Sequence, residues 1–175
     1  MKHLLILFVA SLLLSCDEQE VVNYPDCINR PDSIVQSLGC GNLFLYQFID
    51  SSKVITVSLD ANRLGLTKKC RAFNLSNVDP AIIVQLEIAG SSSDSVYFNF
   101  CNDVMPPNFG VTKKLKATSG QLFVSSSEDS PFAINQSYRV SIKLKDLRLY
   151  DSDNNQEIFF NEIIFWDVLV GFLPG

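Results

Sequence analysis

The sequence predicts an all-β protein, an antiparallel β-sandwich of about eight strands, with a closed β-barrel as the alternative. Short segments of alternating apolar and polar residues recur about every 8–12 residues, with turn-forming residues between them. No stretch of a dozen residues keeps the period of a helix, which is about 3.6 residues. The chain has 175 residues, of which 47% are hydrophobic and 19% charged. This composition excludes a disordered tail, a collagen-like repeat and a coiled coil, and the length allows one domain.

Five segments in the first hundred residues or so have the pattern of strands: 42–49, 54–60, 70–75, 82–89 and 96–101. The first is apolar on both faces, as expected for a central strand, and most of the others alternate in hydropathy. Residues 17–38 contain Pro25 and Pro31 and keep no period, so we expect a tether followed by a loop or a short helical turn. Pro106 and Pro107 mark a crossing loop.

The remaining strands are expected at 114–125, 136–144 and 157–170. Gly120 predicts a bulge or a close approach in the first of these. The alternation shifts by one residue after Asp146, which a β-bulge would explain, and residues 151–155 have turn chemistry. The last segment is the most apolar, so we expect it to be paired on both sides or buried between sheets, with Trp166 in the core.

The N-terminus has the features of an export signal. Lys2 precedes an apolar run from Leu4 to Leu14, which is too short to span a membrane. Leu13-Leu14-Ser15-Cys16 resembles the lipobox of bacterial lipoproteins, which implies cleavage before Cys16 and acylation of that cysteine. Two or three acyl chains at about 0.8 kcal/mol per buried CH₂ would anchor the protein stably. The expected organisation is a signal peptide over 1–15, a lipidated tether and loop over 16–38, and a β-sandwich domain over 39–175.

The acidic segment after the lipidated cysteine bears on localisation. Asp17-Glu18-Gln19-Glu20 resembles the export signal of Bacteroidetes-type lipoproteins that are sent to the cell surface, although a solvated acidic linker is the alternative. We therefore expect a lipid anchor in the bacterial envelope, in the outer membrane. The export-signal interpretation adds exposure at the cell surface, and the linker interpretation leaves the face of the membrane open. The 14 basic and 19 acidic residues give a net charge of −5, which offers no electrostatic footprint for nucleic acid.

Five cysteines indicate two disulfides in an exported domain. With Cys16 acylated, four cysteines remain: Cys27, Cys40, Cys70 and Cys101. The sequence contains no CxxC pair, the spacing that would indicate a metal site, so we expect disulfides. Three connectivities are open. We favour Cys40–Cys101 with Cys27–Cys70, because Cys40 and Cys101 lie at strand ends, and Cys27–Cys40 is the main competitor.

The chemistry available to the mature chain is limited. The single histidine, His3, lies in the signal peptide, so histidine-based catalysis and histidine-ligated metals are excluded after cleavage. Carboxylate chemistry remains, with Asp60, Glu87, Asp103 and Glu162 as candidates for a carbohydrate-active enzyme, although no pair stands out. Phosphate-binding loops are absent from the sequence, and we expect no cofactor.

One acidic segment has the spacing of a calcium-binding loop. Its candidate ligands are Asp151, Asp153, Asn155, Glu157 and Glu162. Gln156 replaces the glycine that such a loop needs at its turn, and strands flank the segment where helices are required. A polar β-hairpin turn is the favoured interpretation.

Three segments together resemble a group of small Bacteroidetes-type bacterial lipoproteins of unassigned function. They are Gly39-Cys40-Gly41-Asn42, Cys101-Asn102-Asp103-Val104 and residues 168–175. The resemblance implies a secreted all-β domain and adds no catalytic residue. We therefore expect a non-catalytic, lipid-anchored module that binds a ligand, a carbohydrate or an envelope protein, with a carboxylate-dependent enzyme as the alternative. Tyr46 and Phe44 could line such a binding surface with Trp166, although the alternation along their strands predicts that these three side chains are buried in the core.

Overall fold

A computed structural model describes residues 27–77, 79–90, 100–101, 111–127 and 137–171. Cys16 and the acidic segment 17–20, most of the expected strand 96–101, Asp103, and Pro106 and Pro107 lie outside these ranges.

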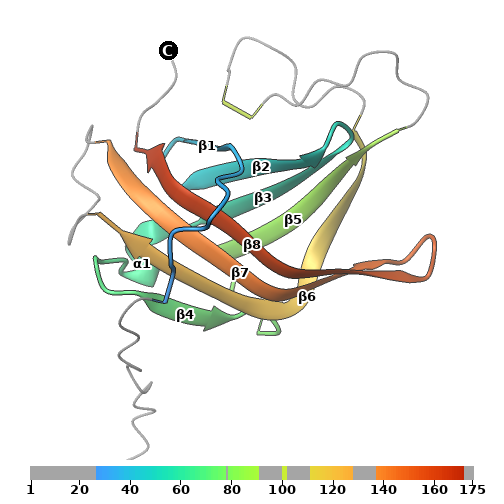
Figure 1. The fold of residues 1–175 in the computed structure, drawn as a ribbon. Coiled ribbons are helices and arrows are strands. Elements are labelled where there is room, and N and C mark those ends of the chain that lie inside the picture. Colours follow the sequence, from blue (N-terminus) through green and yellow to red (C-terminus); the bar gives the residue numbers. More distant parts are fainter. Residues whose placement is uncertain (1–26, 78, 91–99, 102–110, 128–136, 172–175) are drawn as a thin grey trace, which may run out of the picture.

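Nearly all of the regular secondary structure in the described residues is strand (Figure 1). The elements in chain order are β1 (Ser37–Cys40), β2 (Phe44–Asp50), β3 (Lys53–Leu59), α1 (Ala61–Leu64), β4 (Arg71–Asn74), β5 (Ile82–Ala89), β6 (Val111–Ser126), β7 (Tyr138–Asp151) and β8 (Gln156–Val170). The prediction of an all-β antiparallel fold with about eight strands is confirmed.

The strands form one antiparallel path in the order β1-β2-β3-β5-β6-β7-β8, and β4 adds to β6 beside this path. The sheet curls into a half-barrel (Figure 1). Strand β6 joins its two halves, because its first residues pair with β5 and its later residues pair with β7 and β4. The two layers expected of a sandwich are thus parts of a single curled sheet.

Two elements were not predicted. Residues 31–36 contain no helix, and the strand β1 begins at Ser37, within the segment expected to be a tether and loop. The one-turn helix α1 is too short to show a helical period in the sequence. The Asp60 carboxylate caps it by accepting a hydrogen bond from the Arg63 N–H at 3.1 Å, and Gly65 ends it with a φ of 56°.

The predicted one-residue shift in the alternation of buried and exposed residues near Asp146 is confirmed. Lys145 and Asp146 are both exposed, and Asp146 has a φ of 51°. Opposite them, the register of β6 with β7 shifts around Gly120, which has a φ of 132°. A Cβ at Gly120 would lie 3.1 Å from the Leu147 Cα, so the backbones approach each other closely there, as a bulge requires.

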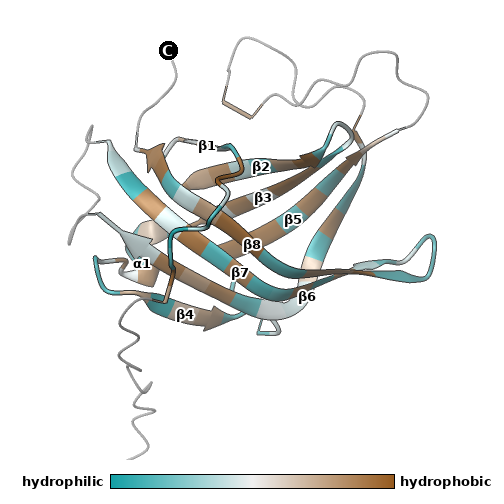
Figure 2. Cartoon of the chain, viewed as in Figure 1, coloured by the Kyte–Doolittle hydropathy of each residue, from teal (hydrophilic) through white to brown (hydrophobic). Residues whose placement is uncertain are grey.

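The core lies inside the curl of the sheet. Alternate residues of the strands point into it, and Figure 2 shows hydrophobic and hydrophilic bands alternating along β7. Its largest side chains with less than 2% exposure are Phe165, Leu45, Ile55, Leu86, Leu122, Ile142, Leu144, Leu147 and Leu149. Tyr138 is also buried, and its hydroxyl donates to the backbone carbonyl of Asn42, linking β7 to the turn between β1 and β2.

The expectation for the last strand is wrong in two respects. Among the described residues, strand β8 ends the path and forms a ladder with β7 only, and several of its side chains are exposed. It is therefore neither paired on both sides nor buried between sheets. Trp166 is half-buried, whereas its neighbour Phe165 is fully buried. Because adjacent residues of a strand point to opposite faces, burying Phe165 in the core turns Trp166 to the outer face of the sheet.

Candidate functional site

The two ends of the sheet meet at a seam, where β1 lies beside β8. Six successive antiparallel pairings separate these strands, so β1 runs parallel to β8. The contact depends on Gly39, because a Cβ there would lie 2.7 Å from Val170 Cγ1 and 3.0 Å from Val168 Cγ1. At the upper end of the seam, the Gly171 N–H donates to the Gly41 carbonyl at 2.7 Å. Glycine is therefore required for β1 to approach β8.

Residues 28–36, which we call the strap, continue the line of β1 along β8. The strap has no regular secondary structure, and Figure 1 shows it rising past β8 to reach β1. Among the described residues, no backbone hydrogen bond joins the strap to β8. The strap is held at one end by β1 and at the other by the disulfide of Cys27.

The structure contains two disulfides, Cys27–Cys70 and Cys40–Cys101, which are the pairings favoured from the sequence. Their Cα–Cα distances are 6.3 Å and 5.8 Å, within the normal range for a disulfide. The first attaches the start of the strap to the segment that leads into β4. The second attaches the end of β1 to residues 100–101. Both disulfides therefore fasten the N-terminal side of the seam.

A hollow of about 400 Å³ lies in the seam, and we call it the seam hollow. Residues from the strap, β2 and β8 line it: Pro31, Ser33 and Val35; Gln47, Phe48 and Ile49; and Phe160, Glu162, Ile163 and Ile164. Most of this lining is apolar. The Gln47 Oε1 is already engaged, because it accepts a hydrogen bond from the Ser37 hydroxyl at 2.8 Å.

Glu162 is the only carboxylate among the residues that line the seam hollow, and it is exposed. No ion pair or hydrogen bond within the described part of the chain involves its side chain. Glu157, in the same strand, differs in this respect because it forms an ion pair with Arg148. The nearest cation along the ladder is Lys145, which lies opposite Glu162 on β7 but outside the hollow lining. The seam hollow therefore has largely apolar walls and one acidic side chain that forms no ion pair in the described residues.

Aromatic side chains extend along the outer face of β2, next to the seam. Tyr46 lies between Phe44 and Phe48, and Phe100 packs on it with a centroid distance of 4.7 Å. Tyr46 and Phe44 are half-buried rather than core residues, so these two candidates from the sequence do lie at a surface. Further large apolar side chains in this part of the molecule are at least one-third exposed: Ile34, Val35, Leu38, Phe48 and Ile49. The seam is thus bordered by an apolar surface.

A second hollow, of about 330 Å³, lies between the β4–β5 connection and β6. Its lining includes Leu75, Ile83 and Ala117, with Asp79 as its only carboxylate and Lys116 as its only ammonium among the described residues. It is smaller than the seam hollow, and it lies within the sheet path rather than where the two sheet ends meet.

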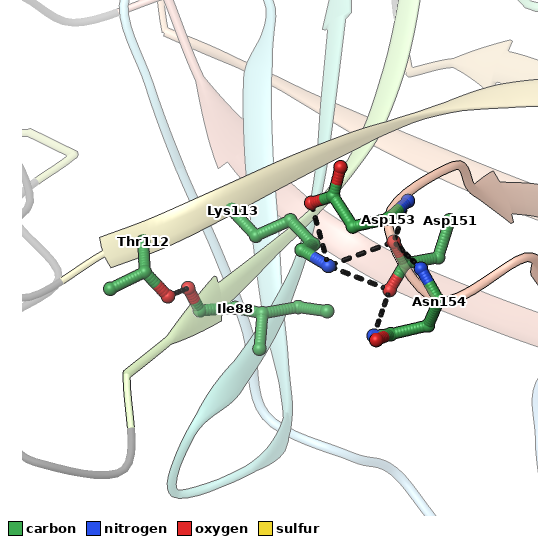
Figure 3. Close-up of polar contacts among 6 residues, drawn as sticks. All are labelled: Ile88, Thr112, Lys113, Asp151, Asp153 and Asn154. Atoms are coloured by element: carbon green, nitrogen blue, oxygen red, sulfur yellow. Dashed lines mark hydrogen bonds and ion pairs between the residues drawn. The ribbon is translucent and has the colours of Figure 1, made fainter.

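The acidic turn between β7 and β8 is organised around a lysine (Figure 3). Lys113 Nζ lies 2.8 Å from both carboxylate oxygens of Asp151 and 3.1 Å from Asp153 Oδ2. Asp151 also accepts hydrogen bonds from the Asn154 side chain at 2.9 Å and from the Asp153 N–H at 3.1 Å. The hydrogen bond with Lys113 is the main reason that the pKa of Asp151 is lowered, and its partners Asp151 and Asp153 raise the pKa of Lys113.

The structure does not bring the candidate calcium ligands together. Asp151 and Asp153 converge on Lys113, Asn155 accepts a hydrogen bond from Tyr150, and Glu157 pairs with Arg148. Glu162 lies six residues along β8 from Gln156, which is about 20 Å at ~3.3 Å per residue. In the described part of the chain, no group of three or more metal-ligating side chains could hold a metal ion. The segment is a polar hairpin turn in this structure.

The candidate catalytic carboxylates are also dispersed. Asp60 caps α1, Glu87 is buried on β5 and pairs with Lys114 at 3.0 Å, and Glu162 lies at the seam hollow. Asp103 lies outside the described residues. Each of the two hollows has one carboxylate among the residues described, whereas glycoside hydrolysis needs two facing each other about 5–9.5 Å apart.

Comparisons with known proteins give no further assignment: no family model matches the chain, and no curated protein or solved structure is significantly similar to it. Within the described residues, the single short helix is neither long nor apolar enough to cross a membrane.

Proposed function

We propose that this protein is a lipid-anchored binding module of the bacterial envelope, attached through Cys16 to the outer membrane and facing the cell surface. Its binding site is the seam hollow, and it takes up a ligand or a partner protein there. The observation that carries the proposal is that the seam hollow lies where the two ends of the sheet meet, next to an exposed apolar surface. Exposed apolar patches of this kind commonly mark interaction sites.

Three features support this proposal over a carboxylate-dependent enzyme. The lipobox-like Leu13-Leu14-Ser15-Cys16 and the two disulfides fit an exported, anchored protein. The seam hollow has one carboxylate among its described residues, where the enzyme needs two. Its largely apolar lining with a few polar groups is typical of a binding pocket.

The anchor is tested by replacing Cys16 with serine. The wild-type protein should incorporate labelled palmitate and remain in the membrane fraction after an alkaline wash. The Cys16→Ser variant should incorporate none and should stay uncleaved or become soluble. Unchanged labelling or membrane retention of this variant would show that the anchor is not at Cys16.

The binding site is tested by photocrosslinking in intact cells. A photoreactive amino acid replaces Val35, which lines the seam hollow and is 50% exposed. The matched control replaces Tyr150, which is 47% exposed but lies on β7, outside that lining. A specific adduct from position 35 that is absent from position 150 supports the proposal. No adduct at position 35, or the same adducts at both positions, would contradict it.

A further inference from the structure

We propose that the occupant of the seam is an extended peptide segment of a partner protein, carrying lysine or arginine, which adds as a strand to the free edge of β8. This inference rests on the binding function proposed above and specifies the partner that the seam accepts. It is built on the hydrogen-bonding capacity of β8, on the shape of the seam hollow and on the charge of Glu162.

The first argument is that one edge of β8 has no partner strand among the described residues. A strand directs alternate backbone N–H and C=O groups to each side, and β8 uses one side to pair with β7. We call the opposite side of residues 156–166 the seam edge. The bond from Gly171 to Gly41 lies beyond this edge, and the described strap residues donate no backbone hydrogen bond to it. The seam edge therefore offers a row of backbone groups that another strand can satisfy.

The second argument is that the strap already follows the path of a strand without forming one. It continues β1 parallel to β8, and its residues 31, 33 and 35 line the same hollow as residues 160 and 162–164 of β8. Moving the strap aside breaks no described backbone hydrogen bond to β8. An incoming peptide would gain backbone hydrogen bonds to β8 that the strap does not make. The seam thus has space and bonding capacity for a peptide strand.

The third argument concerns the side chains of the incoming strand. An extended peptide points every second side chain to one face, and those facing inward would enter the seam hollow between Phe160, Ile163 and Ile49. Apolar residues suit these walls. Glu162 is the only charged side chain among the described lining residues. Its cross-strand neighbour Lys145 lies outside that lining, and no ion pair joins the two within the described residues. The chain carries a net charge of −5. A basic residue in the peptide matches this charge, whereas a second copy of this acidic chain or an anionic membrane does not.

The experiment uses three synthetic nine-residue peptides and the full chain purified in detergent. The first peptide has valine at alternate positions with lysine and threonine between them. The second has glutamate in place of lysine, and the third is the lysine peptide with N-methyl groups on every second amide, which blocks strand pairing. Binding is measured by fluorescence anisotropy, and hydrogen exchange of the β8 amides is measured in parallel.

We expect the lysine peptide to bind and to slow exchange over residues 158–164. The glutamate and N-methyl peptides should bind at least tenfold more weakly. Glu162→Gln should weaken binding of the lysine peptide about two- to fivefold, the effect of one exposed ion pair. The charge-matched control Asp146→Asn should leave binding unchanged, because Asp146 is exposed on β7, outside both the hollow lining and the seam edge.

Other results would overturn the inference. If the N-methyl peptide binds as tightly as the lysine peptide, the partner does not add as a strand. If the glutamate peptide binds as tightly as the lysine peptide, the site does not select a basic partner. Concentration-dependent protection of β8 without any peptide would show a second copy as the occupant. If the lysine peptide fails to bind while position 35 still yields its specific adduct, the strand inference fails and the binding function stands. Loss of that adduct would instead refute the binding function itself.

Discussion

Lys113 and Asp151 form a two-pronged ion pair that joins the start of β6 to the end of β7, with Lys113 Nζ 2.8 Å from each carboxylate oxygen. The Asp151 side chain is 6% exposed and that of Lys113 23%. The ammonium thus occupies the acidic turn whose spacing matches a calcium-binding loop but whose favoured interpretation from the sequence is a polar hairpin.

This pair predicts how stability depends on pH. The pKa of Asp151 is lowered from 3.8, so its contribution is complete above that value and is lost as the pH falls through the lower, folded pKa. The pKa of Lys113 is raised from 10.5, so its contribution is lost as the pH rises through the higher, folded pKa. Urea unfolding midpoints should therefore fall at both extremes. In the Asp151→Asn variant, the urea midpoint should change less with pH below pH 4 than it does in the wild type.

The matched controls are Lys113→Met and Lys145→Met. Both remove one positive charge, but Lys145 is exposed and forms no ion pair within the described residues, although Glu162 lies opposite it on β8. Lys113→Met should lower the urea midpoint at pH 7, and Lys145→Met should leave it close to wild type. Equal midpoints for the two variants would show that the Lys113–Asp151 pair does not stabilise the fold.

The close approach at the seam predicts that Gly39→Ala destabilises the protein. The added methyl group would lie 2.7 Å from Val170 Cγ1, and overpacking of this kind costs about 1–3 kcal/mol. Repeating the change in a Val170→Ala background should cost less, because the clashing methyl group has been removed. Urea unfolding of the two single variants and the double variant measures this coupling. Strict additivity would mean that β1 does not press against β8 at this point.

The two disulfides predict different local effects. With sequence separations of 43 and 61 residues, each is worth about 4 kcal/mol in the chain-entropy model. Replacing Cys27 and Cys70 with serine should speed hydrogen exchange in the strap most. Replacing Cys40 and Cys101 should do so mainly in β1. Non-reducing peptide maps provide the direct check, and a Cys27–Cys40 linkage or four alkylatable thiols would contradict the structure.

The outward position of Trp166 predicts a modest role in stability. Phe165→Ala removes a fully buried ring and should cost about 3–5 kcal/mol. Trp166 is half-buried, so Trp166→Ala should cost clearly less. The indole should emit at an intermediate wavelength and be quenched partly by acrylamide. A blue-shifted and unquenched emission would place Trp166 in the core after all.

Short-range patterns located most of the secondary structure. The predicted segment 82–89 coincides with β5, and the predicted segment 157–170 differs from β8 by one residue. The phase shift at Asp146 was visible because a bulge changes the local alternation itself. Strand β1 was missed because four residues after two prolines carry too little alternation to read.

The seam could not be predicted in the same way, because it depends on how far the sheet curls. Apolar content suggested that β8 is paired on both sides or buried, yet among the described residues the curl brings β1, the strap and part of β2 near its second edge without forming a ladder. The spacing of Asp151 and Glu162 suggested a shared ligand set, but an extended β8 carries Glu162 away from the turn. Alternation along a strand reports which residues face inward. Which strands become neighbours, which carboxylate meets a lysine and where a hollow remains depend on long-range packing, and these were decided only when the sheet closed on its core.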